Sequence, residues 1–240
     1  MPGKYLKGAF VEFMPTFLVP LPNIIIFQFN PETMTHTWTP SAPDTAAAGP
    51  SGTGNPLAVK GLPGESFSFT LAMDASDMIA DGSPVAVGLA TATGIYSRLA
   101  ALEMLLYPTG AFTGSGLLGQ VSSAISSALG GSSPQVDRSV PQYTVPTVLF
   151  VWGPGRILPV RVTSLTITEK LYDALLLNPT HAEAQIGLQV LTPDEVVALT
   201  DTLSQIATVA YGYSQALRQA LALANLANAA ESIIGMLPIG

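Results

Sequence analysis

The chain has 240 residues, enough to bury a sizeable core, and 48% of them are hydrophobic while only 10% are charged, against about 25% in a typical soluble domain. Its net charge of −7 with only nine Lys and Arg argues against a nucleic-acid partner, because phosphate binding needs clustered cations. The absence of cysteine excludes disulfides, thiolate metal sites and cysteine nucleophiles.

The N-terminal region predicts two short strands. Residues Tyr5 to Phe13 and Ile24 to Phe29 are the strand candidates, and the segment from Pro15 to Pro22 between them contains three prolines, which disfavour regular structure. The β-branched and aromatic residues of the second run favour a half-buried pleated surface. Because Pro31 has no N–H and biases Asn30 away from helix, we expect this strand to end near Asn30.

A long loop, an alternating strand and a helix follow. Residues Ser41 to Gly64 are rich in Pro, Gly, Ala, Ser and Thr, which predicts a long mobile loop. Ser66 to Met73 alternates apolar and polar residues and predicts a half-buried antiparallel strand. Ala92 to Leu106 has apolar residues at spacings of three and four, which predicts an amphipathic helix ended by Pro108.

The middle of the chain contains a second low-complexity stretch, from Thr109 to Pro141, for which we expect flexibility until a partner orders it. Three further strand candidates come after it: Thr144 to Trp152, Val160 to Thr168 and Ala184 to Leu191. Residues 1–191 therefore predict a mainly β domain with one internal helix, of the α+β class.

A helical extension is predicted for residues 192–240. Thr192, Pro193 and Glu195 form a capping box with proline at the first helical position, and the helix is expected to run from Asp194 to about Ile234, with Gly212 as a candidate bend. An apolar seam repeats at spacings of four and three: Leu199, Leu203, Ile206, Ala210, Tyr213 and Leu217. We interpret the extension as an assembly arm; the alternative is a helical hairpin folded onto its own domain.

The shortage of charge needs an explanation. A membrane span requires about 20 consecutive apolar residues, and the apolar runs of this sequence are interrupted well before that length. Glu12 and the prolines after it replace the apolar core of a signal peptide, so we expect no secretion signal. Burial of the surface by other subunits is the better explanation, and an Ala- and Gly-rich soluble protein is the alternative.

No catalytic, cofactor or metal site is predicted. The letters of Gly114 to Gly119 match a dinucleotide fingerprint, but they follow a helix rather than a strand, so a linker is the preferred interpretation. His36 and His181 stand far apart without further ligands at metal spacing. His181 has Glu183 nearby, which leaves a hydrolase as a remote alternative, although no nucleophile elbow exposes a serine.

Two smaller groups of residues also have alternative interpretations. Asp74, Asp77 and Asp81 are spaced as on a helix face, but Gly82 and a nearby proline favour a solvated acidic turn. The two tryptophans, Trp38 and Trp152, are candidates for ligand or interface contacts, and we expect at least one of them in the core.

Several motifs together resemble the tube-protein family of contractile injection systems, the phage-tail-like machines of bacteria and myophages. They are Phe-Gln-Phe-Asn-Pro-Glu at residues 27–32, the alternating strand after the Gly-rich loop, the helix residues Tyr96 to Leu102, and Pro-Thr-Val-Leu-Phe-Val-Trp-Gly at residues 146–153. The resemblance covers roughly Tyr5 to Leu191. It implies a β-sandwich or barrel of two packed sheets, six copies of which close into a ring, and no enzymatic activity.

The resemblance is nearest to the baseplate adaptor that starts the tube between the spike hub and the first tube ring. It implies the hub, the inner tube protein and the baseplate wedges as partners, with no direct membrane insertion, and assembly in the bacterial cytoplasm into a particle or virion. The LysM-like module of such adaptors has no counterpart after Leu191. The interface candidates are Phe29, Asn30, Pro31, Glu32, Trp152 and the seam residues above. The alternative function is a soluble ligand- or carbohydrate-binding β-domain.

Overall fold

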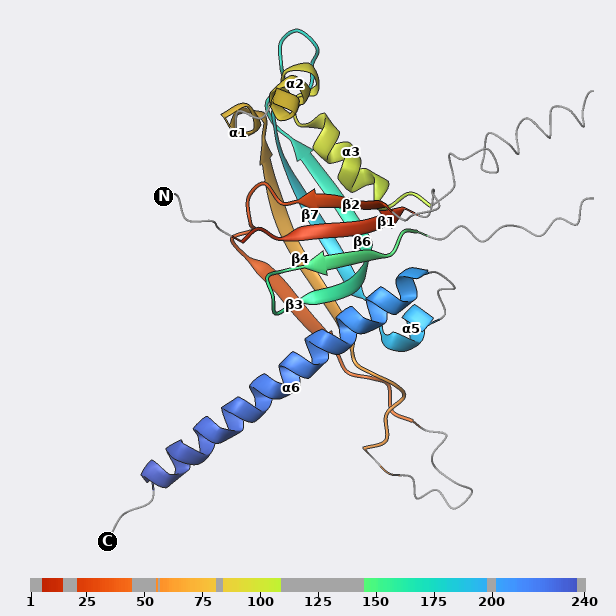
Figure 1. Cartoon of the computed structure of the whole chain (residues 1–240), viewed down its shortest axis with the longest axis vertical. Helices are drawn as coiled ribbons and strands as arrows, with labels where there is room; N and C mark the ends of the chain where they lie inside the picture. Colours follow the sequence, from red (N-terminus) through yellow and green to blue (C-terminus); the bar gives the residue numbers. More distant parts are fainter. Residues whose placement is uncertain are drawn as a thin grey trace, which may run out of the picture.

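The computed structural model describes residues 6–14, 21–44, 55, 57–80, 84–108, 145–197 and 202–236. Within these ranges the chain forms one seven-stranded antiparallel sheet with strand order β2-β1-β5-β6-β7-β4-β3 (Figure 1). The strands are β1 (Ala9–Met14), β2 (Leu21–Ile26), β3 (Met34–Thr39), β4 (Gly64–Asp74), β5 (Val148–Val151), β6 (Ile157–Glu169) and β7 (His181–Val190).

The sheet curls so that its two halves enclose one aromatic core. Phe10 on β1 and Phe69 on β4 belong to strands that are not neighbours in the sheet, yet their ring centroids lie 6.3 Å apart. Phe67 and Phe150 approach to 5.5 Å in the same way. Figure 1 shows β1, β2 and β5 crossing β4, β6 and β7 at a steep angle. Burial of these rings, worth about 2 kcal/mol each, stabilises the curled form.

A β-bulge contributes to the bend of β6. The pairing of β6 with β7 shifts register between Val162 and Ser164, and such an extra residue bends a strand. Gly187 lies opposite, where a β-carbon would come within 2.4 Å of the Ser164 hydroxyl oxygen. Any larger residue at this point of the bulge would push the Ser164 hydroxyl aside.

The predicted α+β class with mostly β structure is confirmed, and the arrangement of the strands differs in detail from the expectation. The described residues form a single open sheet rather than two, with β2 and β3 as its edges. One continuous sheet can enclose the core because the bend lets its two halves face each other.

The predicted helix at residues 92–106 is divided into two. Helix α2 (Pro84–Thr93) and helix α3 (Tyr96–Met104) are separated at Gly94, which has a φ of +58°. A β-carbon there would lie 2.2 Å from the Pro179 carbonyl oxygen, which instead accepts a hydrogen bond from Ile95 N–H at 2.9 Å. Beyond the break, α3 places Leu99 and Leu102 in the core.

Three further differences concern short elements. Strand β3 has no counterpart among the predicted strands, and β2 begins at Leu21, inside the proline-rich segment. Pro22 is tolerated there because β2 is an edge strand, with one side free of ladder bonds. The predicted acidic turn is instead helix α1 (Ala75–Ala80), whose first turn is capped by the Asp74 carboxylate accepting from Ser76 N–H at 2.7 Å.

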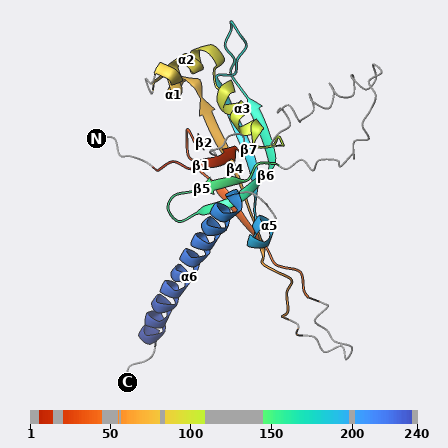
Figure 2. The same ribbon diagram turned by 45° about the vertical axis from the view of Figure 1, so that its right-hand side comes forward.

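The C-terminal extension consists of two helices, α5 (Pro193–Val197) and α6 (Thr202–Met236). The predicted start is confirmed: Glu195 accepts hydrogen bonds from the N–H and hydroxyl of Thr192. Helix α6 runs through Gly212 without a break. Its first half packs on β6, and its second half projects away from the sheet in both views (Figures 1 and 2).

Candidate functional site

The segment from Phe27 to Glu32 leaves edge strand β2 with two buried side chains, Phe27 and Gln28, and continues with side chains at the surface. Phe27 is buried, and its ring meets that of Phe10 edge-on at 5.0 Å. Its N–H donates to the Gly8 carbonyl at 2.9 Å. A β-carbon on Gly8 would lie within 2.8 Å of the rings of both Phe27 and Trp152, so glycine permits this close approach.

Gln28 fixes the segment to the far end of β4. Its side chain is only 6% exposed. The amide oxygen accepts from Asp74 N–H at 3.0 Å, and the amide nitrogen donates to the Asp74 carbonyl at 2.7 Å and to the Asp77 carboxylate at 3.0 Å. The side-chain amide thus pairs with Asp74 as a neighbouring strand would.

Asn30 makes a second connection of the same kind. Its side-chain oxygen accepts from Gly8 N–H, and its side-chain nitrogen donates to the Leu6 carbonyl, both at 2.9 Å. The expected corner after the strand is therefore held by two side-chain amides, Gln28 and Asn30. Pro31 has no N–H to leave unpaired at the turn.

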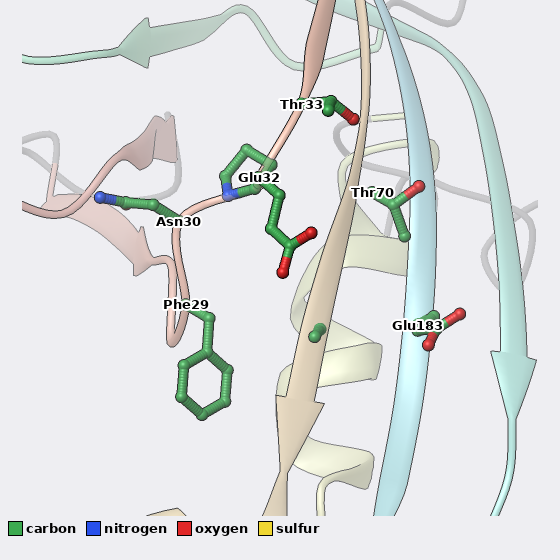
Figure 3. A pocket seen from close by; sticks show the side chains of 8 residues that line it. Phe29, Asn30, Glu32, Thr33, Thr70 and Glu183 are labelled. Atoms are coloured by element: carbon green, nitrogen blue, oxygen red, sulfur yellow. The ribbon is translucent and has the colours of Figure 1, made fainter.

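A shallow groove of about 560 Å³ lies beside this corner (Figure 3). One wall is the segment from Phe29 to Thr33, and the other is formed by Thr70, Ala72 and Glu183 on β4 and β7. Lys170 pairs with Glu183 and holds the pKa of its carboxyl below the ordinary value. The groove presents an aromatic ring, hydroxyls and carboxylates, a mixture suited to binding a polar or cationic segment.

A charged cluster joins the opposite edge of the sheet to α6. Glu65 on β4 is only 3% exposed and accepts hydrogen bonds from both terminal nitrogens of Arg218 on α6. His36 on edge strand β3 lies 2.9 Å from the same carboxylate. The Arg218 guanidinium also lies over the Trp38 ring, 4.9 Å from its centroid. We call these four residues the arm clamp.

The part of α6 that packs on the sheet uses little of the predicted seam, from which only Ala210 is buried among the described side chains. Its buried residues are Ala207, Ala210, Tyr211 and Ser214. The Ser214 hydroxyl accepts from Ile157 N–H at 3.1 Å and donates to the Ile157 carbonyl at 2.9 Å. Small residues let α6 approach β6 closely. A pattern of large apolar side chains does not reveal such a contact.

The predicted seam residues are distributed differently. Ile206 and Tyr213 are exposed, and Tyr213 donates its hydroxyl hydrogen to the Pro154 carbonyl at 2.8 Å. Leu217 is half-buried. Leu199 lies outside the described residues, and only the backbone of Leu203 is described.

The aromatic candidates divide between core and surface. Trp152 packs against the core, 6.4 Å from Phe27 and 6.2 Å from Phe150, as expected of at least one tryptophan. Phe29 is 43% exposed at the groove. Among the predicted interface residues, the structure thus brings Phe29, Asn30, Pro31 and Glu32 together and places Ile206 and Tyr213 elsewhere on the surface.

His181 is paired with a carboxylate other than the one nearest to it in the sequence. His181 pairs with Asp74 at 3.3 Å rather than with Glu183, and no hydrogen bond of the described residues joins it to a serine. Hydrogen bonds from Ser76 and His181 outweigh partial burial and lower the pKa of Asp74. No group of three or more potential metal ligands occurs in the described part of the chain, and the letters at Gly114 to Gly119 lie outside it.

The described part of the chain contains no helix long and apolar enough to cross a membrane. No protein-family model and no curated protein matches the sequence.

Proposed function

We propose that this chain is a structural ring subunit of a contractile injection system, located in the baseplate or inner tube between the spike hub and the first tube ring. In this role the chain has no enzymatic activity. It assembles with identical copies in the bacterial cytoplasm, and then contacts the hub, the inner tube protein and the baseplate wedges in a particle or virion.

The observation that carries the proposal is the pair of open sheet edges. In the described residues, β2 and β3 each have a ladder partner on one side only. An unpaired edge is an aggregation hazard in a monomer and a natural pairing site in an assembly. Since the two edges differ, β2 of one copy and β3 of the next form a heterologous contact, which closes into a ring when the rotation permits. Such pairing completes the barrel that one chain leaves open.

The surface of edge strand β2 supports the same role. Ile24 and Ile26 are both more than half exposed, and Phe29 follows them at the corner. Isolated apolar residues are common on surfaces, but a row of them along an open edge in a chain with 10% charged residues is typical of an interface that another subunit covers.

A ligand- or carbohydrate-binding domain is the second candidate, favoured by the groove beside Glu32. The groove has a suitable volume, and among the described residues Glu32 has no hydrogen bond or ion pair. In the ring proposal the same groove accepts a polar segment of a neighbouring subunit.

Negative-stain images and mass measurement of the purified protein test the ring. We expect annular particles with a mass six times that of the chain, and sheath and spike genes beside the gene for this chain. Ile24→Lys/Ile26→Lys should shift the mass to that of the monomer, whereas Leu57→Lys, at an 83% exposed position outside strands β2 and β3, should leave the ring intact. A stable wild-type monomer that is absent from sheathed particles would refute the proposal.

A further inference from the structure

The projecting part of α6 is an almost uncharged helix whose side chains are exposed from Gln219 to Leu226. We call residues 219–236 the arm; its sequence contains a single charged residue, Glu231. Leu221, Leu223 and Leu226 are 62%, 67% and 65% exposed. No other described element runs beside the arm in either view (Figures 1 and 2). A helix that is apolar on several sides is normally buried in a larger structure.

The exposed leucines lie on two different sides of the arm. At 3.6 residues per turn, Leu221 is rotated by roughly 140–160° from Leu223 and Leu226 around the helix axis. Only Gln219 and Asn225 interrupt the apolar surface among residues 219–226. One flanking helix covers only one side, so the arm needs two neighbours to bury both.

The base of the arm is held rigidly. Tyr213, Ser214 and Arg218 connect α6 to the rest of the structure at three positions, through Pro154, Ile157 and Glu65. Arg218 is the last residue before the arm, so the arm clamp fixes its direction. The arm is therefore a continuous extension, in a fixed direction, of a helix that packs on the sheet.

The surface area of the arm favours several copies over one isolated pair. Its 18 residues make a rod about 27 Å long and about 10 Å wide, with a lateral surface of about 850 Å². One flanking helix covers about a third of that, well below the roughly 800 Å² per partner of a stable complex. Two neighbours roughly double the covered area, and bodies already held in a ring supply a high effective concentration.

We infer that the arms of neighbouring copies pack side by side, with the Leu221 side of one arm on the Leu223 and Leu226 side of the next. The occupant is a second copy because the two sides then complement each other by symmetry. The leucine-bearing stretch also has no charge to repel an identical helix. This inference rests on the proposed ring, which brings the arms together.

The absence of cysteine from the chain permits a clean cross-linking test. Leu221→Cys/Leu223→Cys places thiols on opposite sides of each arm, so mild oxidation with copper–phenanthroline of the full-length assembled protein should convert the monomer band into a ladder beyond the dimer. The matched control, Leu223→Cys/Leu226→Cys, places both thiols on one side and should stay monomeric. All three positions are exposed, so both variants should fold like the wild type.

The outcomes separate this inference from the proposed function. Dimers from the control variant without a ladder from the first would overturn side-by-side packing in favour of a symmetric pair. Rings in the electron microscope without cross-links from either variant would overturn the inference and leave the proposed function standing. A ladder without rings would support arm packing and count against the ring, and the absence of both would overturn both.

Discussion

Replacement of Arg218 by alanine should destabilise the folded sheet and also release the arm from it. The substitution removes both guanidinium hydrogen bonds from the buried Glu65 carboxylate and uncovers Trp38. His36 remains as the only partner of the carboxylate in the arm clamp. The expected result is a large loss of stability from a residue that is itself partly exposed.

The magnitude follows from the burial of Glu65. Removal of one partner from a buried ion pair costs about 3–5 kcal/mol. Because the Arg218 side chain is 27% exposed and His36 still contacts Glu65, we expect about 2–3 kcal/mol, with about 0.5–1 kcal/mol more from the lost cation–π contact. The free energy of unfolding should therefore fall by about 3 kcal/mol.

Urea unfolding followed by tryptophan fluorescence measures this loss, since Trp38 lies under the guanidinium. The control is Glu65→Gln in the Arg218→Ala background, which removes the uncompensated charge and should recover about 1–2 kcal/mol. If the single variant stays within about 0.5 kcal/mol of the wild type, or if the double variant is less stable than the single one, the arm clamp does not stabilise the fold as described.

Three further outcomes are expected. Gln28→Ala should lower the free energy of unfolding by about 2–3 kcal/mol through its lost hydrogen bonds to Asp74 and Asp77, and an unchanged urea midpoint would contradict a stabilising role for these bonds. Gly94→Ala should destabilise the fold by about 2 kcal/mol or more, whereas Gly88→Ala, in open space within α2, should stabilise it by about 0.5–1 kcal/mol. A higher melting temperature for Gly94→Ala than for Gly88→Ala would contradict the requirement for glycine between α2 and α3. The pKa of Asp74 lies below its ordinary value of 3.8. The ionised Asp74 carboxylate therefore stabilises the fold above pH 3.8, and this stabilisation is lost as the pH falls through the lower folded-state pKa. Asp74→Asn should flatten that part of the stability–pH curve, and an unchanged slope would contradict a role for Asp74.

The strands with strict alternation could be predicted from the sequence. Ser66 to Met73 lies within β4, and the candidates at 160–168 and 184–191 overlap β6 and β7 almost completely. Alternation identifies such strands because each has one face on the aromatic core. The capping box at Thr192 was equally readable, since it depends on neighbours in sequence.

Structural features that depend on residues distant in sequence were not predicted. Strand β3 reads as Met-Thr-His-Thr-Trp-Thr, in which threonine alternates with larger residues. Its larger side chains face inward because His36 contacts Phe67 and Trp38 contacts Arg218. The break at Gly94 requires the Pro179 carbonyl, 85 residues away. Local patterns contain neither partner.

Of the candidate site, a corner after the second strand was predictable, but β2 ends at Ile26, four residues before the expected end near Asn30, because Gln28 and Asn30 hold the following residues through their side chains. The pairing of Gln28 with Asp74 and of Asn30 with Leu6 and Gly8 joins residues 22 to 46 positions apart. The arm clamp shows the same limit, because Arg218 and Glu65 are separated by 153 positions.

The proline after Asn30 has a chemical consequence for the long-term stability of this corner. Spontaneous deamidation of asparagine begins when the backbone nitrogen of the next residue attacks the side-chain carbonyl, and Pro31 has no N–H proton to give up for that attack. Conversion to aspartate would replace the amide that donates to Leu6 with an acceptor and break the connection. Asn30 is therefore protected against the commonest slow chemical change of asparagine, and both hydrogen bonds of its side chain are kept.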